Sequence, residues 1–424
     1  MTTFKAEVFQ NQYLPQGARE VHAIVTVSSE GAAITTAAAT GGKLFGILCD
    51  VSGSMEGEKI HAAKDAIVQL IDMIPADVSF FVVAGSTVAD LIFDAAPATP
   101  ASKQRAVQAV RKVTASGGTA ISTWVVRAIE QFQTMPHAIR QALLLTDGQN
   151  DKNDATSLAS ALKKSQGVFQ CDCRGVGTDW DVRQLKEIGN ALLGTTDIIA
   201  NPAGIAADFQ NVLASAVGKS VSDVVVRLWT PVGAKVQFCK EVSPSITDLS
   251  SMAAQVNPRT LEYPTGAWSG SESRDYHFAI EVNPGNVGDE MLAGRASLVT
   301  KQSGVETKIA EARILAVWTD DEAKSTRIER HVAHYTGQAD LAESIQAGLE
   351  ARASGKEDVA TALLGKAVRI AHDSGNEATA KLLRTVVDVD DPATGTVRLK
   401  RTVAKEDEMA LETRSTKTKR IQKA

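Results

Sequence analysis

The sequence predicts an α/β fold, in which a doubly wound, mostly parallel sheet is inserted in or flanked by a β-sandwich and is followed by a C-terminal helical region. Three observations lead to this prediction. Short apolar runs alternate with segments of helical periodicity between residues 43 and 217, as expected of repeated βα units. Residues 220–319 then contain several short strands, and residues 321–387 have helical patterns.

The composition limits the class of protein. The 424 residues are enough for two or three domains, and the formal net charge of −5 gives no reason to expect nucleic acid or an anionic membrane as the main partner. No apolar run approaches the roughly 18 residues of a membrane span, and the N-terminus lacks the pattern of a secretory signal. The four scattered cysteines favour reduced thiols over disulfides or a zinc site. We therefore expect a soluble cytoplasmic protein.

Residues 1–40 are predicted to form strands that join the β-sandwich. The stretch "REVHAIVTVSS" places Val21, Ala23, Val25 and Val27 on one face. The small residues of "EGAAITTAAATGG" then indicate a linker. Because these strands have no core of their own, we expect them to pair with strands that follow the α/β domain. That domain would then be an insertion with its two ends close together.

The α/β domain, residues 43–217, begins with "KLFGILCD", a continuous apolar run typical of a strand buried on both faces. The following helix has apolar residues at helical spacing from Ile60 to Ile74 and ends before Pro75. "VSFFVVAG" and "ADLIFDAA" predict a hairpin-like pair of strands. The remaining segments predict two helices and then alternating strands and helices: "SKQRAVQAVRKV", "STWVVRAIEQFQTM", "IRQALLLTDG", "ATSLASALKKS", "VFQCDCRGVG", "VRQLKEIGNALLG", "TDIIA" and "IAADFQNVLASAV".

The rest of the chain predicts three further regions. Short strands such as "VSDVVVRLWT" and "DYHFAIEV" assign residues 220–319 to the β-sandwich. Residues 321–387 are expected to be helical, with turns at Gly355 and Gly375. From residue 388 the chain is polar and ends in many basic residues, so we expect residues 388–424 to be a mobile basic tail.

Three loops of the α/β domain are rich in oxygen ligands. The first, "DVSGS", supplies Asp50, Ser52 and Ser54 directly after a buried strand. The second, "SGGTAIS", supplies Thr119, and the third, "LLLTDGQND", supplies Asp147 after a strongly apolar strand. The glycines in these loops let the backbone approach closely. Because ligands bind at the carboxyl ends of the strands in an open parallel sheet, these side chains are expected to converge there.

The chemistry of this set predicts a cation site. Carboxylates and hydroxyls are hard oxygen donors, and neither histidine nor cysteine is among them. Such donors suit Mg²⁺, with Mn²⁺ and Ca²⁺ as alternatives, rather than zinc. Neutral hydroxyls as direct ligands would leave the ion electron-poor and ready to accept a carboxylate from outside.

These motifs resemble the metal-ion-dependent adhesion site (MIDAS) of von Willebrand factor A domains. The Asp-x-Ser-x-Ser loop, the threonine and the second aspartate of that family match Asp50, Ser52, Ser54, Thr119 and Asp147. The resemblance covers about residues 43–217. It implies a Rossmann-like sheet, serines that bind the metal directly, aspartates that act largely through water, and a partner whose Asp or Glu completes the shell.

The resemblance also implies a class of function. It is that of a bacterial cytoplasmic scaffold or adaptor without enzyme activity, in stress or signalling systems with kinases and phosphatases, or in assembly with an AAA+ ATPase. No nucleic acid and no membrane are expected as partners. The sequence itself names no partner.

Other interpretations of the same residues remain open. The first is a haloacid-dehalogenase-like phosphatase with Asp50 as nucleophile and magnesium held by Asp147 and Asp151. Against it, no glycine precedes Asp147, and Ser52 stands where a general acid is needed. Alternatively, Asp50 and Ser54 could cap the first helix while Asp147 starts a turn. A structural scaffold whose site holds no metal is a further possibility.

Overall fold

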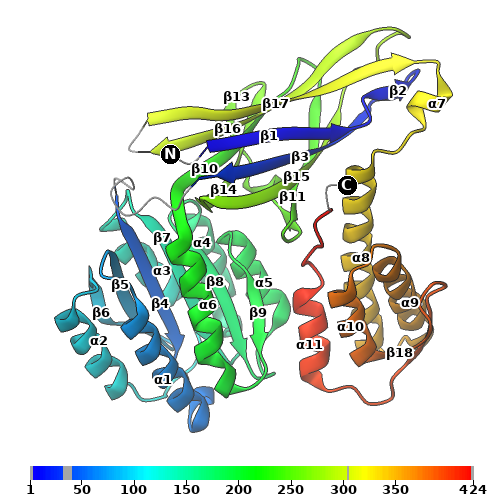
Figure 1. Ribbon diagram of the computed structural model, residues 1–424. Coiled ribbons are helices and arrows are strands. Elements are labelled where there is room, and N and C mark those ends of the chain that lie inside the picture. Colours follow the sequence, from blue (N-terminus) through cyan, green and yellow to red (C-terminus); the bar gives the residue numbers. More distant parts are fainter. Residues whose placement is uncertain (1–2, 32–40, 303–304, 422–424) are drawn as a thin grey trace. The chain divides into compact units, whose positions relative to one another are not determined.

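The computed structural model describes residues 3–31, 41–302 and 305–421 (Figure 1). The chain divides into two compact units. We call residues 33–222 and 266–270 the α/β unit, and residues 1–32, 223–265 and 271–424 the β-helical unit, because the second combines β-sheets with C-terminal α-helices and is not a β-helix. The stretch predicted to be a linker falls mainly outside the described residues. No helix in the described ranges is long and apolar enough to cross a membrane.

The α/β unit is built on a six-stranded sheet in the order β6-β5-β4-β7-β8-β9. Its strands are β4 (Lys43–Asp50), β5 (Val78–Gly85), β6 (Ala89–Pro97), β7 (Ile139–Thr146), β8 (Gln170–Val176) and β9 (Thr196–Ile199). All neighbours are parallel except β5 and β6, which pair antiparallel as the predicted hairpin-like pair. The doubly wound α/β fold predicted from the alternating pattern is therefore confirmed.

Helices cover both faces of this sheet (Figure 1). They are α1 (Glu58–Met73), α2 (Pro100–Lys112), α3 (Ile121–Gln133), α4 (Ala155–Ser165), α5 (Val182–Ala191) and α6 (Ile205–Gly218). The neighbouring residues Phe80 and Phe81 of β5 point to opposite faces. Phe80 belongs to a core shared with α1, α2 and α6, whereas Phe81 packs edge-on against Phe132 of α3. Burial on both faces explains why the central strands are continuous apolar runs.

The β-helical unit contains two mostly antiparallel sheets. One has the order β1-β3-β15-β11-β12 and the other β13-β14-β10-β16-β17-β2. The strands are β1 (Thr3–Gln10), β2 (Tyr13–Pro15), β3 (Glu20–Glu30), β10 (Lys219–Trp229), β11 (Lys235–Ser243), β12 (Thr247–Asp248), β13 (Ala254–Asn257), β14 (Thr260–Ser269), β15 (Ser271–Glu281), β16 (Glu290–Gln302) and β17 (Val305–Thr319). Strand β3 pairs with β15 along its length, so the N-terminal strands share a sheet with strands that follow the α/β domain.

The prediction that residues 388–424 form a mobile tail is wrong for most of that segment. After α7 (Glu322–Ser325), α8 (Arg330–Ala353), α9 (Glu357–Asp373) and α10 (Glu377–Val386), the chain forms β18 (Val387–Asp391), β19 (Thr396–Leu399) and α11 (Lys405–Arg414). Val397 and Leu411 are buried in one core with residues of α8, α9 and α10. A few well-spaced apolar side chains thus anchor a segment that is polar on average, because the helices before it leave an apolar face to be covered.

Candidate metal centre

The candidate centre lies where the strand order of the sheet reverses. From β4 the chain moves to β5 on one side and later returns to β7 on the other side. Asp50 is the last residue of β4, and Asp147 directly follows β7. Because β4 and β7 are parallel neighbours, both aspartates lie at the same edge of the sheet. This is the position at which open α/β sheets bind ligands.

The backbone and a neighbouring strand hold Asp50 in place. Its Oδ1 accepts a hydrogen bond of 2.8 Å from the Ser52 backbone N–H, and its Oδ2 accepts one of 2.6 Å from the Thr146 hydroxyl. The side chain is fully buried, and this burial raises the pKa of Asp50 even though these hydrogen bonds act to lower it. A cation beside Asp50 would favour its ionised form and so offset the cost of burial.

A chain of hydrogen bonds links the first loop to the third. The hydroxyls of Ser52 and Ser54 are 3.0 Å apart, and Ser54 Oγ donates to Asp147 Oδ1 at 2.7 Å. The other oxygen, Asp147 Oδ2, accepts a hydrogen bond of 2.5 Å from Lys59 Nζ. Partial burial alone would lower the pKa of Lys59, but the hydrogen bond and the charge of Asp147 raise it.

Sequence reasoning missed two of these contacts. Lys59 lies in the first turn of α1, directly after the serine loop, and Thr146 is the residue before Asp147. A lysine so soon after an acidic motif was a usable signal. No sequence signal pointed to the contact of Thr146 with Asp50, because this contact depends on the register between β4 and β7.

The second loop is fastened to its neighbours by backbone groups. Gly53 N–H donates to Gly117 O at 2.9 Å, and Gly118 N–H donates to Thr87 Oγ1 at 2.8 Å. Thr119, which follows them, is buried. These bonds hold the second loop against the first loop and against the loop after β5.

Gly148 shows that Thr119 and Ser54 face the same space. A Cβ atom placed on Gly148 would lie 3.3 Å from Ser54 Oγ and 3.6 Å from Thr119 Oγ1. The space between these two hydroxyls therefore exists because residue 148 has no side chain. The structure thus brings together all five residues predicted from the sequence.

The arrangement fits a hard cation and excludes one simpler explanation. Helix α1 has Gly57 as its N-cap residue, without a side-chain cap, so Asp50 and Ser54 do not cap it. The four cysteines are buried and free, and nowhere in the described ranges do three or more His, Cys, Asp or Glu side chains gather as a metal site. Hydroxyls with two carboxylates are the donors that magnesium-type ions prefer.

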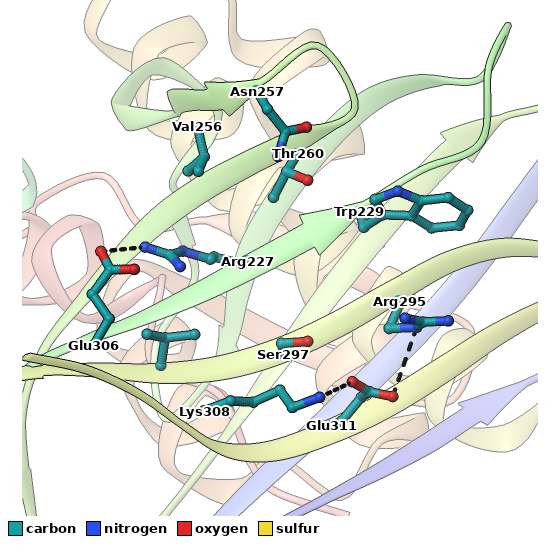
Figure 2. Close-up of a pocket in the computed structure, with 11 residues that line it drawn as sticks. Arg227, Trp229, Val256, Asn257, Thr260, Arg295, Ser297, Glu306, Lys308 and Glu311 are labelled. Carbon is teal, nitrogen blue, oxygen red and sulfur yellow. Dashed lines mark hydrogen bonds and ion pairs between the residues drawn. The ribbon is translucent and has the colours of Figure 1, made fainter.

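A second concavity, of about 410 Å³, lies over β10, β16 and β17 (Figure 2). Arg227 pairs with Glu306 at 2.6 Å, and Lys308 pairs with Glu311 at 2.7 Å. Arg295 lies 3.7 Å from the same Glu311. Three basic and two acidic side chains line this cavity, and each basic side chain lies within 4 Å of a carboxylate, so the charge offered to a ligand is largely compensated. The loops of the α/β unit remain the better candidate site.

Comparisons with known proteins agree with this fold. Residues 46–198 match the family model of the von Willebrand factor type A domain, and residues 369–415 match that of the von Willebrand factor type A C-terminal domain. A solved structure described as von Willebrand factor type A from Catenulispora acidiphila is 45% identical. Its TM-score is 0.93, and the match covers 99% of this chain and 97% of that one. The second family match includes most of the segment that was predicted to be mobile.

More distant relatives share less. The ArnB paralog VWA2 from Sulfolobus acidocaldarius is 14% identical with a TM-score of 0.61, over 98% of both chains, and so shows the fold alone. Inter-alpha-trypsin inhibitor heavy chain H1 from Mesocricetus auratus is 30% identical over 32% of this chain and 16% of its own length. An uncharacterized protein from Synechocystis is 25% identical over 48% of this chain and 49% of its own length. The chain thus spans half or less of these two relatives.

Proposed function

The chain belongs to the von Willebrand factor type A family, whose domains often mediate protein–protein interactions, and from this membership we propose that it is a metal-dependent binding protein. Its candidate centre would hold Mg²⁺, or alternatively Mn²⁺ or Ca²⁺, and a partner protein would supply an Asp or Glu carboxylate. The convergence of three hydroxyls and two carboxylates at the sheet edge carries this proposal.

Each residue has a proposed role in holding the cation. Ser52, Ser54 and Thr119 offer neutral oxygens, while Asp50 and Asp147 supply the negative charge around them. When bound, the cation would act as a Lewis acid for an incoming carboxylate. Four of these side chains are buried, whereas Ser54 is exposed, so a partner would approach from the side of Ser54.

A binding role agrees better with Asp50 than a phosphatase role does. A nucleophilic carboxylate must reach the phosphorus atom with a free oxygen. The side chain of Asp50 is fully buried, and both of its oxygens accept hydrogen bonds, from Ser52 and Thr146. We therefore propose an adaptor or scaffold rather than an enzyme.

Calorimetric titration with Mg²⁺ tests the proposal. The wild type is compared with Ser52→Ala/Ser54→Ala, and Ser157→Ala/Ser160→Ala serves as the control because both serines are exposed on α4 of the same unit. A phosphatase assay is run on the same samples. We expect the wild type and the control to bind Mg²⁺, the site variant to lose binding, and no sample to turn over substrate.

The other outcomes separate the alternatives. Turnover that disappears in Asp50→Asn would support the phosphatase. A wild type that binds no divalent cation would leave a structural scaffold. If binding is found, a Mg²⁺-dependent pull-down, repeated with the site variant, is the next step toward the partner.

A further inference from the structure

Lys59 makes a charged contact of the candidate centre to which the proposed function assigns no role. Its Nζ is 2.5 Å from Asp147 Oδ2 and 3.6 Å from Asp179 Oδ2. The Asp147 side chain is fully buried, whereas that of Asp179 is 69% exposed. One ammonium group therefore lies within reach of two carboxylates, one inside the centre and one in solvent.

The ammonium group and a divalent cation are alternative counter-ions for Asp147. A buried carboxylate needs a nearby positive charge, because desolvation penalises its ionised form. Ser54 donates to one oxygen of Asp147 and Lys59 neutralises the other. A divalent cation held at the serines would place two more positive charges beside the same carboxylate, and like charges at such short range repel strongly.

We propose that Lys59 is an exchangeable counter-ion, which neutralises Asp147 when no divalent cation is bound and moves to Asp179 when one binds. This step rests on the proposed function, since it requires that the centre binds a cation. Lysine suits the role because it carries a compact charge on a flexible four-carbon stem. Asp179 is already within ion-pair distance, so the move is short.

Under this proposal, Lys59 and Asp179 change the metal affinity in opposite directions. Lys59 weakens metal binding because the cation must displace it from Asp147. Asp179 strengthens metal binding because it receives the displaced ammonium group. The effect of Asp179 should therefore depend on the presence of Lys59, which a double-mutant cycle can measure.

The experiment is a Mg²⁺ titration by calorimetry on the full chain. The variants are Lys59→Met, Asp179→Asn and the double variant. The control is Lys152→Met, which removes an exposed lysine directly after the third loop. The lysine paired with Asp147 is Lys59, so this control removes a nearby charge without touching that ion pair. We expect Lys59→Met to lower the Kd about three- to tenfold. Asp179→Asn should raise it about two- to threefold. In the Lys59→Met background, Asp179→Asn should change the Kd by far less.

Thermal unfolding gives a second readout that needs no partner. With a chelator, Lys59→Met should melt below the wild type, because Asp147 loses its counter-ion. Added Mg²⁺ should then raise its melting temperature by more than that of the wild type. Lys152→Met should behave as the wild type does in both conditions.

Two results would overturn the proposal while leaving the proposed function standing. In the first, Lys59→Met binds Mg²⁺ no more tightly than the wild type. In the second, Asp179→Asn weakens binding equally in both backgrounds, as a simple long-range charge effect would. If neither the wild type nor Lys59→Met binds a divalent cation, the proposed function fails, and this proposal fails with it.

Discussion

At the scale of single residues, the missing side chain of Gly148 would leave room for the proposed cation. We expect Gly148→Ala to keep the fold, because the backbone of Gly148 is not in the left-handed region, but to weaken Mg²⁺ binding about tenfold. The added methyl group would lie 3.3 Å from Ser54 Oγ and push that hydroxyl aside. Calorimetry measures the change. Gly218→Ala is the matched control, because a Cβ there meets open space. Unchanged affinity in Gly148→Ala would place the cation elsewhere.

A second residue-scale prediction concerns pH and the β-helical unit. Burial, with a smaller effect from His22 and Lys240, lowers the pKa of His277 from 6.5 to about 3. The unfolded chain therefore takes up a proton below pH 6.5 while the folded chain does not, so stability falls as the pH falls through that range. At pH 5 the loss should be about 2 kcal/mol. His277→Gln should remove this loss.

Urea unfolding at pH 7 and pH 5 checks the role of His277. The control is His372→Gln, because the His372 side chain is half exposed. It should keep the pH dependence of the wild type. The same slope in wild type and His277→Gln would contradict the prediction, and would mean that another group titrates between the folded and unfolded states.

Four of the five site residues could be predicted from the sequence because they end a strand or follow one directly, whereas Thr119 lies between α2 and α3 and was identified by the family resemblance. Because β4 and β7 are parallel neighbours, their carboxyl ends meet at one edge of the sheet and bring Asp50 and Asp147 together. Contacts that depend on the direction of a long side chain could not be found this way. Lys59 reaches Asp147 across 88 residues of sequence, and only the structure shows which way its stem points.

At the scale of elements, the periodicity of apolar residues predicted the helices and strands of the α/β unit, but it did not predict α11. Its first turn holds three acidic residues and its buried face only a few apolar ones, so its average polarity suggested disorder. Those few side chains supply the free energy that holds α11 in the fold, because a fully buried leucine stabilises a fold by about 1.5–3 kcal/mol. Leu411 is such a residue.

Leu411→Ala should therefore destabilise the β-helical unit by about 2–5 kcal/mol. The methyl groups that it removes fill the core shared with α8 to α10. Lys405→Ala, at an exposed position of the same helix, should change the stability by less than about 0.5 kcal/mol. Urea unfolding measures both, and hydrogen exchange should show protected amides in α11. A mobile tail would give equal stabilities and no protection.

At the scale of the whole molecule, the chain leaves the β-helical unit after β3 and returns to it near residue 223. The ends of the inserted unit lie close together, since Lys43 at the start of β4 donates a hydrogen bond to Val217 O at the end of α6. Such proximity lets a domain be inserted with little disturbance of the unit around it, and β3, before the insertion, still pairs with β15, which follows it. The sequence predicted this insertion because the first strands had no core of their own.

Because each unit has its own hydrophobic core, we expect calorimetry to show two unfolding transitions. Mg²⁺ at about 100 times its Kd should stabilise only the α/β unit, by about 2.7 kcal/mol. For a unit of this size, that raises the melting temperature by roughly 5–10 °C. Ser52→Ala/Ser54→Ala should abolish the shift, and Leu411→Ala should move only the other transition. If Mg²⁺ moved both transitions together, the two units would be coupled in folding, and the cation would act on the whole chain rather than on the inserted unit.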